Sequence, residues 1–296
     1  MKHSPFILLL VFATVGSAKE LKRPYSVKHK APLNAKISIK QRSNEFTTWR
    51  VEFDGIEGDR VPGFLYAPTS KTKKRPAVLM QYGTGGRKTS SYIVAFGKQF
   101  AAAGFVVLTI DSPQRGERRK KGYRDNLIRQ MHPKKFAQYC GDYSRAVDYL
   151  VSRSDVDVNR IGYVGISWGA ITGVTFCAHD KRIKSVASIV GGGSFGTLLG
   201  HGGRVLSKYP SMDPVDHVAH IAPRPLLLIN VTNDWVVPRV FATALHKAAG
   251  KGKKIVWLKT NHKFTTVNRR AMMGSVIKFM DSGLREPVRE SRRKQP

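Results

Sequence analysis

Residues 161–170 read IGYVGISWGA and place Ser167 between two glycines, Gly165 and Gly169. An apolar run precedes the serine and a helical pattern follows it, so the serine lies at a strand-to-helix turn. The G-x-S-x-G pattern in this context predicts a nucleophile elbow, a strained turn that exposes the serine hydroxyl above a sheet. Both glycines are needed because side chains there would collide with the adjoining strand and helix.

A serine hydroxyl becomes a good nucleophile only when a neighbouring base takes its proton. In the elbow architecture the acid and then the histidine follow the serine along the chain. Asp234 comes just after the apolar run 225–231, and His262 comes just after the run 253–260. The other candidate histidines lie in a predicted helix or precede Asp234: His29, His132, His179, His201, His217, His220 and His246. We therefore predict Ser167, His262 and Asp234 as nucleophile, base and acid.

Acyl transfer also needs backbone N–H groups that stabilise the oxyanion formed at the carbonyl. The amide of Trp168, directly after the serine, is one predicted donor. The second is expected from the turn MQYGTGG, with the amide of Thr84 favoured over that of Gly83. A glycine-rich turn is also a common plain connector, so both interpretations stay open. Asp111 ends another strand but precedes the serine, and we expect it to hold a loop by hydrogen bonds.

Apolar strands alternate with helices along most of the chain, which predicts a mostly parallel sheet covered by helices on both faces. Ligands in such sheets bind at the carboxyl ends of the strands, where the predicted site residues lie. The expected strands are 46–53, 60–67, 75–83, 105–111, 160–167, 185–192, 225–231 and 253–260. The expected helices are 90–103, 133–153, a helix after Ser167, 240–249 and 269–280.

The sequence resembles the α/β-hydrolase superfamily and, within it, the dienelactone hydrolase and acetyl xylan esterase-like branches. The resemblance covers about residues 58–284. It is carried by GFLYAP, PAVLMQYGTGG, AAAGFVVLTIDSPQRGERR, DYLVSRSDVDVNRIGYVGISWGA, IAPRPLLLINVTNDWVVP and TNH. It implies an α/β-hydrolase fold in which Ser167, Asp234 and His262 form the triad and Thr84 and Trp168 supply the oxyanion donors.

Three positions depart from the pattern of these branches. Tyr82 stands where many members have histidine, Trp168 where the xylan esterases have glutamine, and Ala170 where a second glycine is usual. These departures bear on the branch and on the donor geometry rather than on the three triad residues.

The predicted domain organisation is one catalytic domain with basic ends. Residues 1–18 have a basic start, an apolar run and the small residues Gly16-Ser17-Ala18, which predicts a signal peptide cleaved after Ala18 and export of the protein. No apolar run is long enough to predict a transmembrane segment. The remaining predicted parts are a basic arm or edge structure (19–45), the hydrolase domain (46–285) with a cap insertion at about 192–222, and a basic tail (286–296).

The two cysteines, Cys140 and Cys177, each fall on a predicted buried helix stripe. Two sulfurs that face a sheet do not readily face each other, so core packing is favoured over a disulfide. Neither the residues nor the resemblance indicates a metal or an organic cofactor.

The chain carries 51 Lys and Arg against 20 Asp and Glu, a formal net charge of +31. Such a charge attracts polyanions, but zinc-finger spacings and RNA-binding signatures are missing, so no specific nucleic-acid partner is predicted. Residues 114–135 are strongly basic and follow a strand at the expected active-site edge. They suggest an anionic substrate as a hypothesis; ordinary surface charge in a basic protein is the alternative.

The sequence thus predicts an exported serine esterase that acts on a small-molecule or polysaccharide ester, with a small acyl group on a carbohydrate as the favoured substrate. A serine peptidase or thioesterase would use the same residues. A catalytically idle, basic polyanion-binding protein is the alternative from a different class. The sequence indicates no oligomeric state.

Overall fold

The computed structural model describes residues 22–70, 74–123, 129, 132–195 and 212–285. The predicted signal peptide (1–18), residues 196–211 of the predicted cap and the predicted basic tail (286–296) lie outside these residues.

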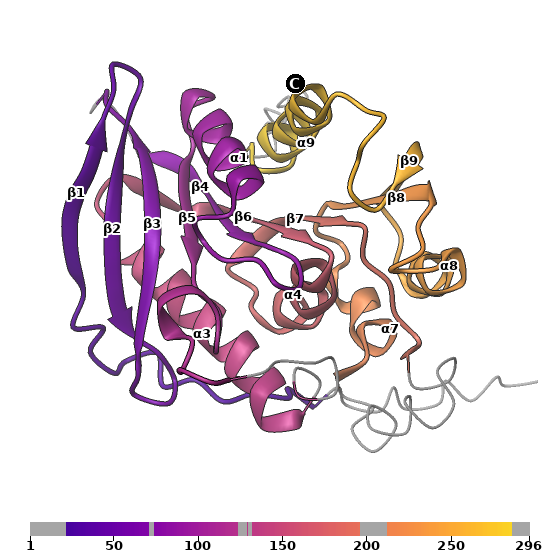
Figure 1. Cartoon of the computed structure of the whole chain (residues 1–296), viewed down its shortest axis with the longest axis horizontal. Coiled ribbons are helices and arrows are strands. Elements are labelled where there is room, and N and C mark those ends of the chain that lie inside the picture. Colours follow the sequence, from indigo (N-terminus) through magenta and orange to yellow (C-terminus); the bar gives the residue numbers. More distant parts are fainter. Residues whose placement is uncertain (1–21, 71–73, 124–128, 130–131, 196–211, 286–296) are drawn as a thin grey trace, which may run out of the picture.

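Within the described residues, nine strands form one sheet in the order β1-β2-β3-β5-β4-β6-β7-β8-β9. Strands β4 to β9 pair in parallel, whereas β1, β2 and β3 join antiparallel at one side, as Figure 1 shows. The strands are β1 (Lys36–Arg42), β2 (Phe46–Asp54), β3 (Arg60–Pro68), β4 (Arg75–Gln81), β5 (Val106–Ile110), β6 (Val156–Ile166), β7 (Ile183–Ile189), β8 (Leu226–Asn233) and β9 (Lys253–Asn261). The predicted mostly parallel sheet is confirmed.

Helices cover both faces of the sheet, as predicted (Figure 1). The helices are α1 (Ser91–Ala102), η1 (Gly116–Arg118), α3 (Pro133–Val151), α4 (Trp168–His179), α7 (Pro214–His217), η3 (Val218–Ile221), α8 (Arg239–Ala248) and α9 (Arg269–Gly283). Helices α1 and α9 bury one core with the sheet, while α3, α4 and α8 bury the other. The long helices turn apolar residues inward, such as Ile93, Phe96 and Phe100 on α1, which recur at helical spacing.

The order of β5, β4 and β6 creates the topological switch point of the sheet. The chain moves from β4 to β5 on one side and then crosses to β6 on the other side of β4. Crevices form at the carboxyl ends of strands where the direction of winding reverses, so β4 and β6 are the strands that position a ligand site.

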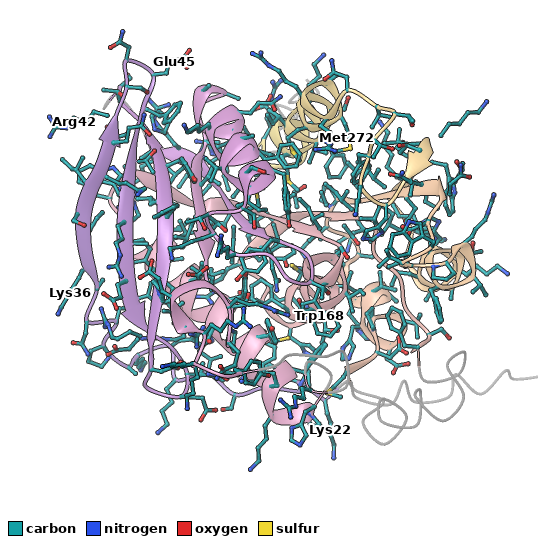
Figure 2. All side chains as sticks on the ribbon, viewed as in Figure 1. Lys22, Lys36, Arg42, Glu45, Trp168 and Met272 are labelled. Carbon is teal, nitrogen blue, oxygen red and sulfur yellow. The ribbon has the colours of Figure 1, made fainter. Side chains whose placement is uncertain are left out.

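Strand β1 is the element that the sequence did not specify beyond an arm or edge structure. It lies at the sheet edge, pairs antiparallel with β2, and all seven of its residues are exposed. Figure 2 labels Lys36 and Arg42 at its two ends. Because neither face of the strand is covered, its sequence, KISIKQR, carries only a weak apolar pattern.

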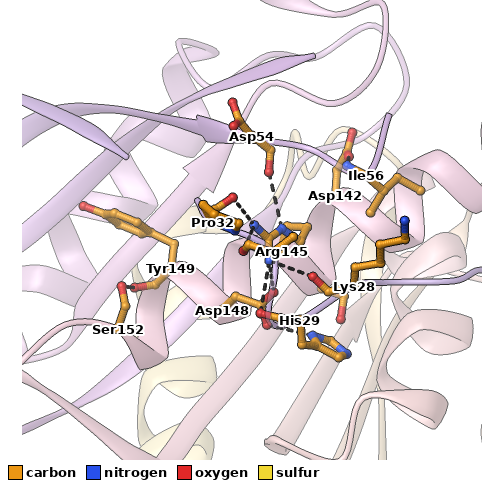
Figure 3. Close-up of polar contacts among 12 residues, drawn as sticks. Lys28, His29, Pro32, Asp54, Ile56, Asp142, Arg145, Asp148, Tyr149 and Ser152 are labelled. Atoms are coloured by element: carbon orange, nitrogen blue, oxygen red, sulfur yellow. Dashed lines mark hydrogen bonds and ion pairs between the residues drawn. The ribbon is translucent and has the colours of Figure 1, made fainter. Parts of the chain in front are cut away.

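Arg145 on α3 fixes the segment before β1 to the domain (Figure 3). Its guanidinium donates to the carbonyl oxygens of Ala31 and Pro32 at 2.9 and 3.0 Å, and to the carboxylate of Asp148 at 2.7 Å. The side chain is buried, so these charge-assisted bonds replace water that the guanidinium lost on folding. Part of the predicted arm (19–45) is therefore bound to α3.

Both cysteines are buried and unpaired, which confirms core packing. Cys140 lies on the buried stripe of α3, and Cys177 lies in α4. Burial raises the pKa of each thiol, so neither is a reactive thiolate at neutral pH.

Candidate active site

Ser167 lies between β6 and α4 in a conformation that few residues adopt. Its φ of 53° and ψ of −114° place it outside the regions that are relaxed for side-chain-bearing residues. A Cβ on Gly165 would lie 2.3 Å from the carbonyl oxygen of Gly169, and one on Gly169 would lie 2.6 Å from that of Gln81. The two glycines are required for the predicted reason, namely close contact with the following helix and with the neighbouring strand β4.

The structure brings the three predicted side chains into one hydrogen-bonded chain. His262 Nε2 lies 3.0 Å from Ser167 Oγ, and His262 Nδ1 lies 2.7 Å from Asp234 Oδ2. A carboxylate only accepts, so Nδ1 carries the proton and Nε2 is free to accept from the serine hydroxyl. This arrangement leaves the imidazole in the tautomer that a general base requires.

The carboxylate of Asp234 is held from two sides. Its second oxygen, Oδ1, accepts from the amides of Val236 and Val237 at 2.9 and 2.8 Å, while Oδ2 accepts from His262. The Asp234 side chain is 3% exposed and that of His262 is 12% exposed. Asp234 is thus fixed by backbone donors and shielded from water. His262 is more exposed and lines the cavity.

The two predicted oxyanion donors lie beside Ser167. Trp168 is the first residue of α4, so its amide is one of the helix N-terminal groups that lack an intrahelical partner. The indole ring of Trp168 packs edge-on against the rings of Phe136 and Tyr139. The amide of Gly83 donates to Tyr92 Oη at 3.1 Å, and Thr84 lines the same cavity as Ser167.

Buried ion pairs hold the loop that carries Thr84. The carboxylate of Asp111 accepts from the backbone amides of Lys88 and Glu117 at 2.9 and 3.0 Å, and from the Lys88 ammonium. The Lys88 side chain is 2% exposed and Asp111 is fully buried. Asp111 therefore holds a loop by hydrogen bonds, which confirms the prediction for this residue.

A cavity of about 460 Å³ opens beside the serine hydroxyl. Its walls are mainly apolar, with polar groups at the reacting end and two cations, Lys263 and Arg269. The lining residues are Gly83, Thr84, Tyr92, Phe96, Ile166, Ser167, Ile189, Val236, His262, Lys263, Phe264, Arg269 and Met272. Sequence reasoning did not single out the two cations, although Lys263 directly follows the predicted base.

The basic stretch 114–135 is partly used in structural ion pairs. Arg118 is largely buried and donates to the carboxylates of Asp59 and Asp142 at 2.7 and 2.8 Å. Burial opposes ionisation of Glu117, but hydrogen bonds from Lys88 and Arg50 hold its pKa below the ordinary value. Residues 124–128, 130 and 131 lie outside the described residues. The described part of this stretch shows cations that stabilise the fold beside the site.

Three other histidines, His179, His217 and His246, have polar partners away from Ser167. His246 Nε2 lies 2.8 Å from Asn230 Oδ1, and Asn230 in turn donates to the carbonyl oxygen of Gly191. Burial, reinforced by the charge of Lys253, lowers the pKa of His246 to about 4. His179 pairs with His217 at 3.1 Å, far along α4 from Ser167.

Among the described residues, no group of three or more His, Cys, Asp and Glu side chains is arranged to bind a metal ion. In the same part of the chain, no helix combines the length and the apolar character needed to cross a membrane.

The fold and the position of the elbow define an α/β-hydrolase. Residues 61–272 match the Dienelactone hydrolase family, and the chain belongs to this family. It is 26% identical to the putative hydrolase YtaP of Bacillus subtilis, an alignment that covers 91% of this chain and 97% of that protein. The chain is therefore a hydrolase, consistent with its family.

Two acetyl xylan esterases have the same fold. Acetyl xylan esterase 1 from Thermoanaerobacterium superimposes with a TM-score of 0.71 at 17% identity, covering 84% of this chain and 88% of that chain. The acetyl xylan esterase from Paenibacillus sp. R4 gives a TM-score of 0.70 at 18% identity, covering 86% and 90%. At these identities the similarity concerns the fold.

Proposed function

We propose that this chain is an exported serine esterase that cleaves a small acyl group from a carbohydrate through a Ser167–His262–Asp234 triad. One observation carries the proposal, the continuous hydrogen-bonded chain from Asp234 through His262 to the hydroxyl of Ser167. That hydroxyl opens into a cavity, so an ester carbonyl can reach it.

In the proposed reaction, Ser167 Oγ attacks the ester carbonyl carbon while His262 Nε2 accepts the hydroxyl proton. The carboxylate of Asp234 stabilises the imidazolium that results. The amides of Trp168 and Thr84 donate to the oxyanion of the tetrahedral intermediate.

The intermediate collapses when the bond from carbonyl carbon to the alcohol oxygen breaks. The leaving alcohol takes the proton from His262 Nε2, and an acyl-enzyme remains on Ser167. A water molecule then attacks the acyl carbon and gives its proton to His262. The bond from the acyl carbon to Ser167 Oγ then breaks, His262 returns the proton to Oγ, and the carboxylic acid is released.

The proposed substrate class follows from proteins of the same fold and from the size of the cavity. Two proteins of the same fold are named acetyl xylan esterases, which suggests an acylated carbohydrate for this chain. The cavity volume of about 460 Å³ lies in the range of small-molecule sites and has room for groups larger than acetyl. A panel of acetylated and feruloylated glycans, with a thioester and a peptide substrate beside them, will show which bond is cleaved.

The catalytic part of the proposal is tested by labelling with a fluorophosphonate, which reacts with an activated serine. We expect wild-type protein to be labelled and Ser167→Ala to remain unlabelled, with kcat for a soluble ester reduced by at least about 10⁴-fold. His262→Ala should cause a loss of similar size, because the serine then has no base. Wild-type protein that is neither labelled nor active would favour the polyanion-binding alternative.

Export is tested separately. We expect the mature protein, recovered from outside the cytoplasm of the producing cell, to begin at Lys19. Recovery of the uncleaved chain from the cytoplasm alone would contradict export and leave the catalytic proposal unchanged.

A further inference from the structure

The segment between β8 and α8 exposes apolar side chains directly after Asp234. Trp235, Val236 and Val240 are 71%, 47% and 51% exposed. Within the described residues, eight large apolar side chains are exposed, and these three fall within six consecutive positions. Single exposed apolar residues are common, whereas grouped ones mark binding surfaces. We call these three residues the Trp235 patch.

The Trp235 patch borders the active site. Val236 belongs to the patch and also lines the cavity beside Ser167. On the other side of Trp235, Asp234 accepts from His262 at 2.7 Å, and His262 lies 3.0 Å from Ser167 Oγ. Neighbouring Cα atoms are about 3.8 Å apart, so the chain holds Trp235 between the triad acid and a wall of the cavity.

The backbone on both sides of Trp235 is fixed. Asp234 Oδ1 accepts from the amides of Val236 and Val237 at 2.9 and 2.8 Å, which closes a turn around Trp235. Val237 is 4% exposed and belongs to the hydrophobic core. The indole ring is therefore exposed on a backbone that is already ordered, and a ligand bound there loses little affinity to ordering of the loop.

A sugar ring fits this surface. The face of an indole is apolar and carries partial negative charge, and a pyranose with equatorial hydroxyls presents only C–H groups on each of its faces. Thr232 and Asn233 are exposed just before Asp234 and can hydrogen-bond to hydroxyls at the edge of the ring. A stable protein interface needs about 800 Å² on each partner, which exceeds what three side chains provide. The size and the mixed polarity of the surface thus favour a carbohydrate over a second copy of the chain.

We infer that Trp235 is a sugar-binding residue: a pyranose with equatorial hydroxyls, such as xylose or glucose, stacks on its indole ring while the ester carbonyl of the same substrate lies at Ser167. This inference rests on the proposed function and assigns a residue that recognises the carbohydrate part of the substrate. Trp235 does not touch the reacting atoms, so its contribution should appear in KM more than in kcat.

Kinetics with sugar and ring-free esters test the inference. Acetylated xylotetraose and acetylated cellotetraose are the sugar esters, and glycerol triacetate is the reference without a ring. We expect Trp235→Ala to lower the ratio of kcat/KM for the better sugar ester to that for glycerol triacetate by about tenfold, mainly through KM. Trp235→Phe keeps a flat ring and should retain part of the ratio. Val158→Ala is the control, because Val158 is an exposed apolar residue near the start of β6, whereas Ser167 follows the end of that strand.

A titration tests sugar binding without catalysis. Xylotetraose and cellotetraose without ester groups are added in turn to ¹⁵N-labelled wild-type protein, and the indole N–H signals of its four tryptophans are followed. The signal of Trp235 is identified by its absence from Trp235→Phe. We expect this signal to shift more than the other three and to saturate with at least one of the two sugars.

The outcomes separate this inference from the proposed function. An unchanged kinetic ratio in Trp235→Ala would overturn the inference, as would a Trp235 signal that neither sugar shifts. Self-association that Trp235→Ala abolishes, without a change in the ratio, would assign the Trp235 patch to a second copy of the chain and contradict sugar binding. Wild-type protein that hydrolyses none of the three esters would count against the proposed function, whereas the titration would still decide whether Trp235 binds sugar.

Discussion

Arg145 and Arg269 lie on opposite faces of the sheet and have opposite surroundings. Arg145 is 2% exposed and donates to the Asp148 carboxylate and to several backbone carbonyl oxygens (Figure 3). Arg269 is exposed beside the cavity, and its described hydrogen bond is the one from Nε to Phe264. One arginine has its donors used by the fold, whereas most donors of the other are exposed beside the cavity.

This difference explains how a chain with a net charge of +31 is stable. Buried cations such as Lys88, Arg118 and Arg145 each contact a buried carboxylate, so the cost of removing them from water is offset locally. The excess positive charge lies on the surface, where water screens it. Net charge by itself therefore does not show which cations the fold uses.

The largest expected effect is on the paired side of the comparison. Arg145→Met removes the donors of the Ala31 and Pro32 carbonyl oxygens and one partner of Asp148. We expect the free energy of unfolding to fall by about 3–4 kcal/mol, because several hydrogen bonds of a charged, buried guanidinium are lost together, although Asp148 keeps Arg182 and His29 as partners. Urea unfolding at pH 7 measures the change. Lys278→Met, an exposed control, should change it by less than about 0.5 kcal/mol; equal values for the two variants would contradict the comparison.

Lys88→Met should lower both the free energy of unfolding and kcat. Without the ammonium, Asp111 is left buried with backbone donors alone, and we expect unfolding free energy to fall by about 3 kcal/mol. Because Lys88 also closes the loop that carries Thr84, kcat should fall more than KM changes. In a double-mutant cycle with Asp111→Asn, the two losses should be less than additive. Strict additivity would show that the pair does not act as a unit.

His246 is buried without a carboxylate partner, and it should make the stability of the protein depend on pH. Since the pKa of His246 is lowered to about 4, the folded protein stays unprotonated there while the unfolded chain takes up a proton near pH 6.5. Stability is therefore fully present above pH 6.5 and declines as the pH falls, by on the order of 1–2 kcal/mol between pH 7 and 5.

Urea unfolding at both pH values measures this loss. His246→Gln should remove the contribution of His246 to this loss, because the amide can replace the hydrogen bond to Asn230 without titrating. His179, whose pKa burial also lowers to about 4, should keep its own contribution. His220→Gln, at an exposed histidine, should keep the wild-type pH dependence. An unchanged slope in His246→Gln would show that other groups cause the acid sensitivity.

The smallest expected effect is on the stability of variants at Arg269 and Lys263. Arg269→Gln and Lys263→Gln should change the free energy of unfolding by no more than about 0.5 kcal/mol, since neither side chain stabilises a buried charge. Thermal or urea unfolding without substrate measures this directly. A loss above 2 kcal/mol for either variant would mean that the fold uses these cations and would contradict the comparison with Arg145.

The strands and helices of the catalytic domain could be predicted because burial repeats at the periods of a strand and a helix. Residues 106–110 read VVLTI and form β5, whose residues are all buried, as a continuous apolar run of this length predicts for a parallel strand. The need for glycine at positions 165 and 169 could also be predicted, because it arises from steric clashes within a short stretch of chain. In contrast, β1 is exposed on both sides and leaves little pattern, and the approach of residues 28–32 to Arg145 depends on contacts distant in sequence.

The amino-acid sequence by itself determined the parallel α/β architecture and the residues that can do chemistry, because periodicity, glycine placement and chain order are local properties. Only the tertiary structure decided which charges serve the fold and which face the cavity. Arg118 lies close in sequence to other cations but is paired and buried, whereas Arg269 reaches the site from a helix far along the chain. Ion pairing depends on distances between segments, and these exist only after the chain has folded.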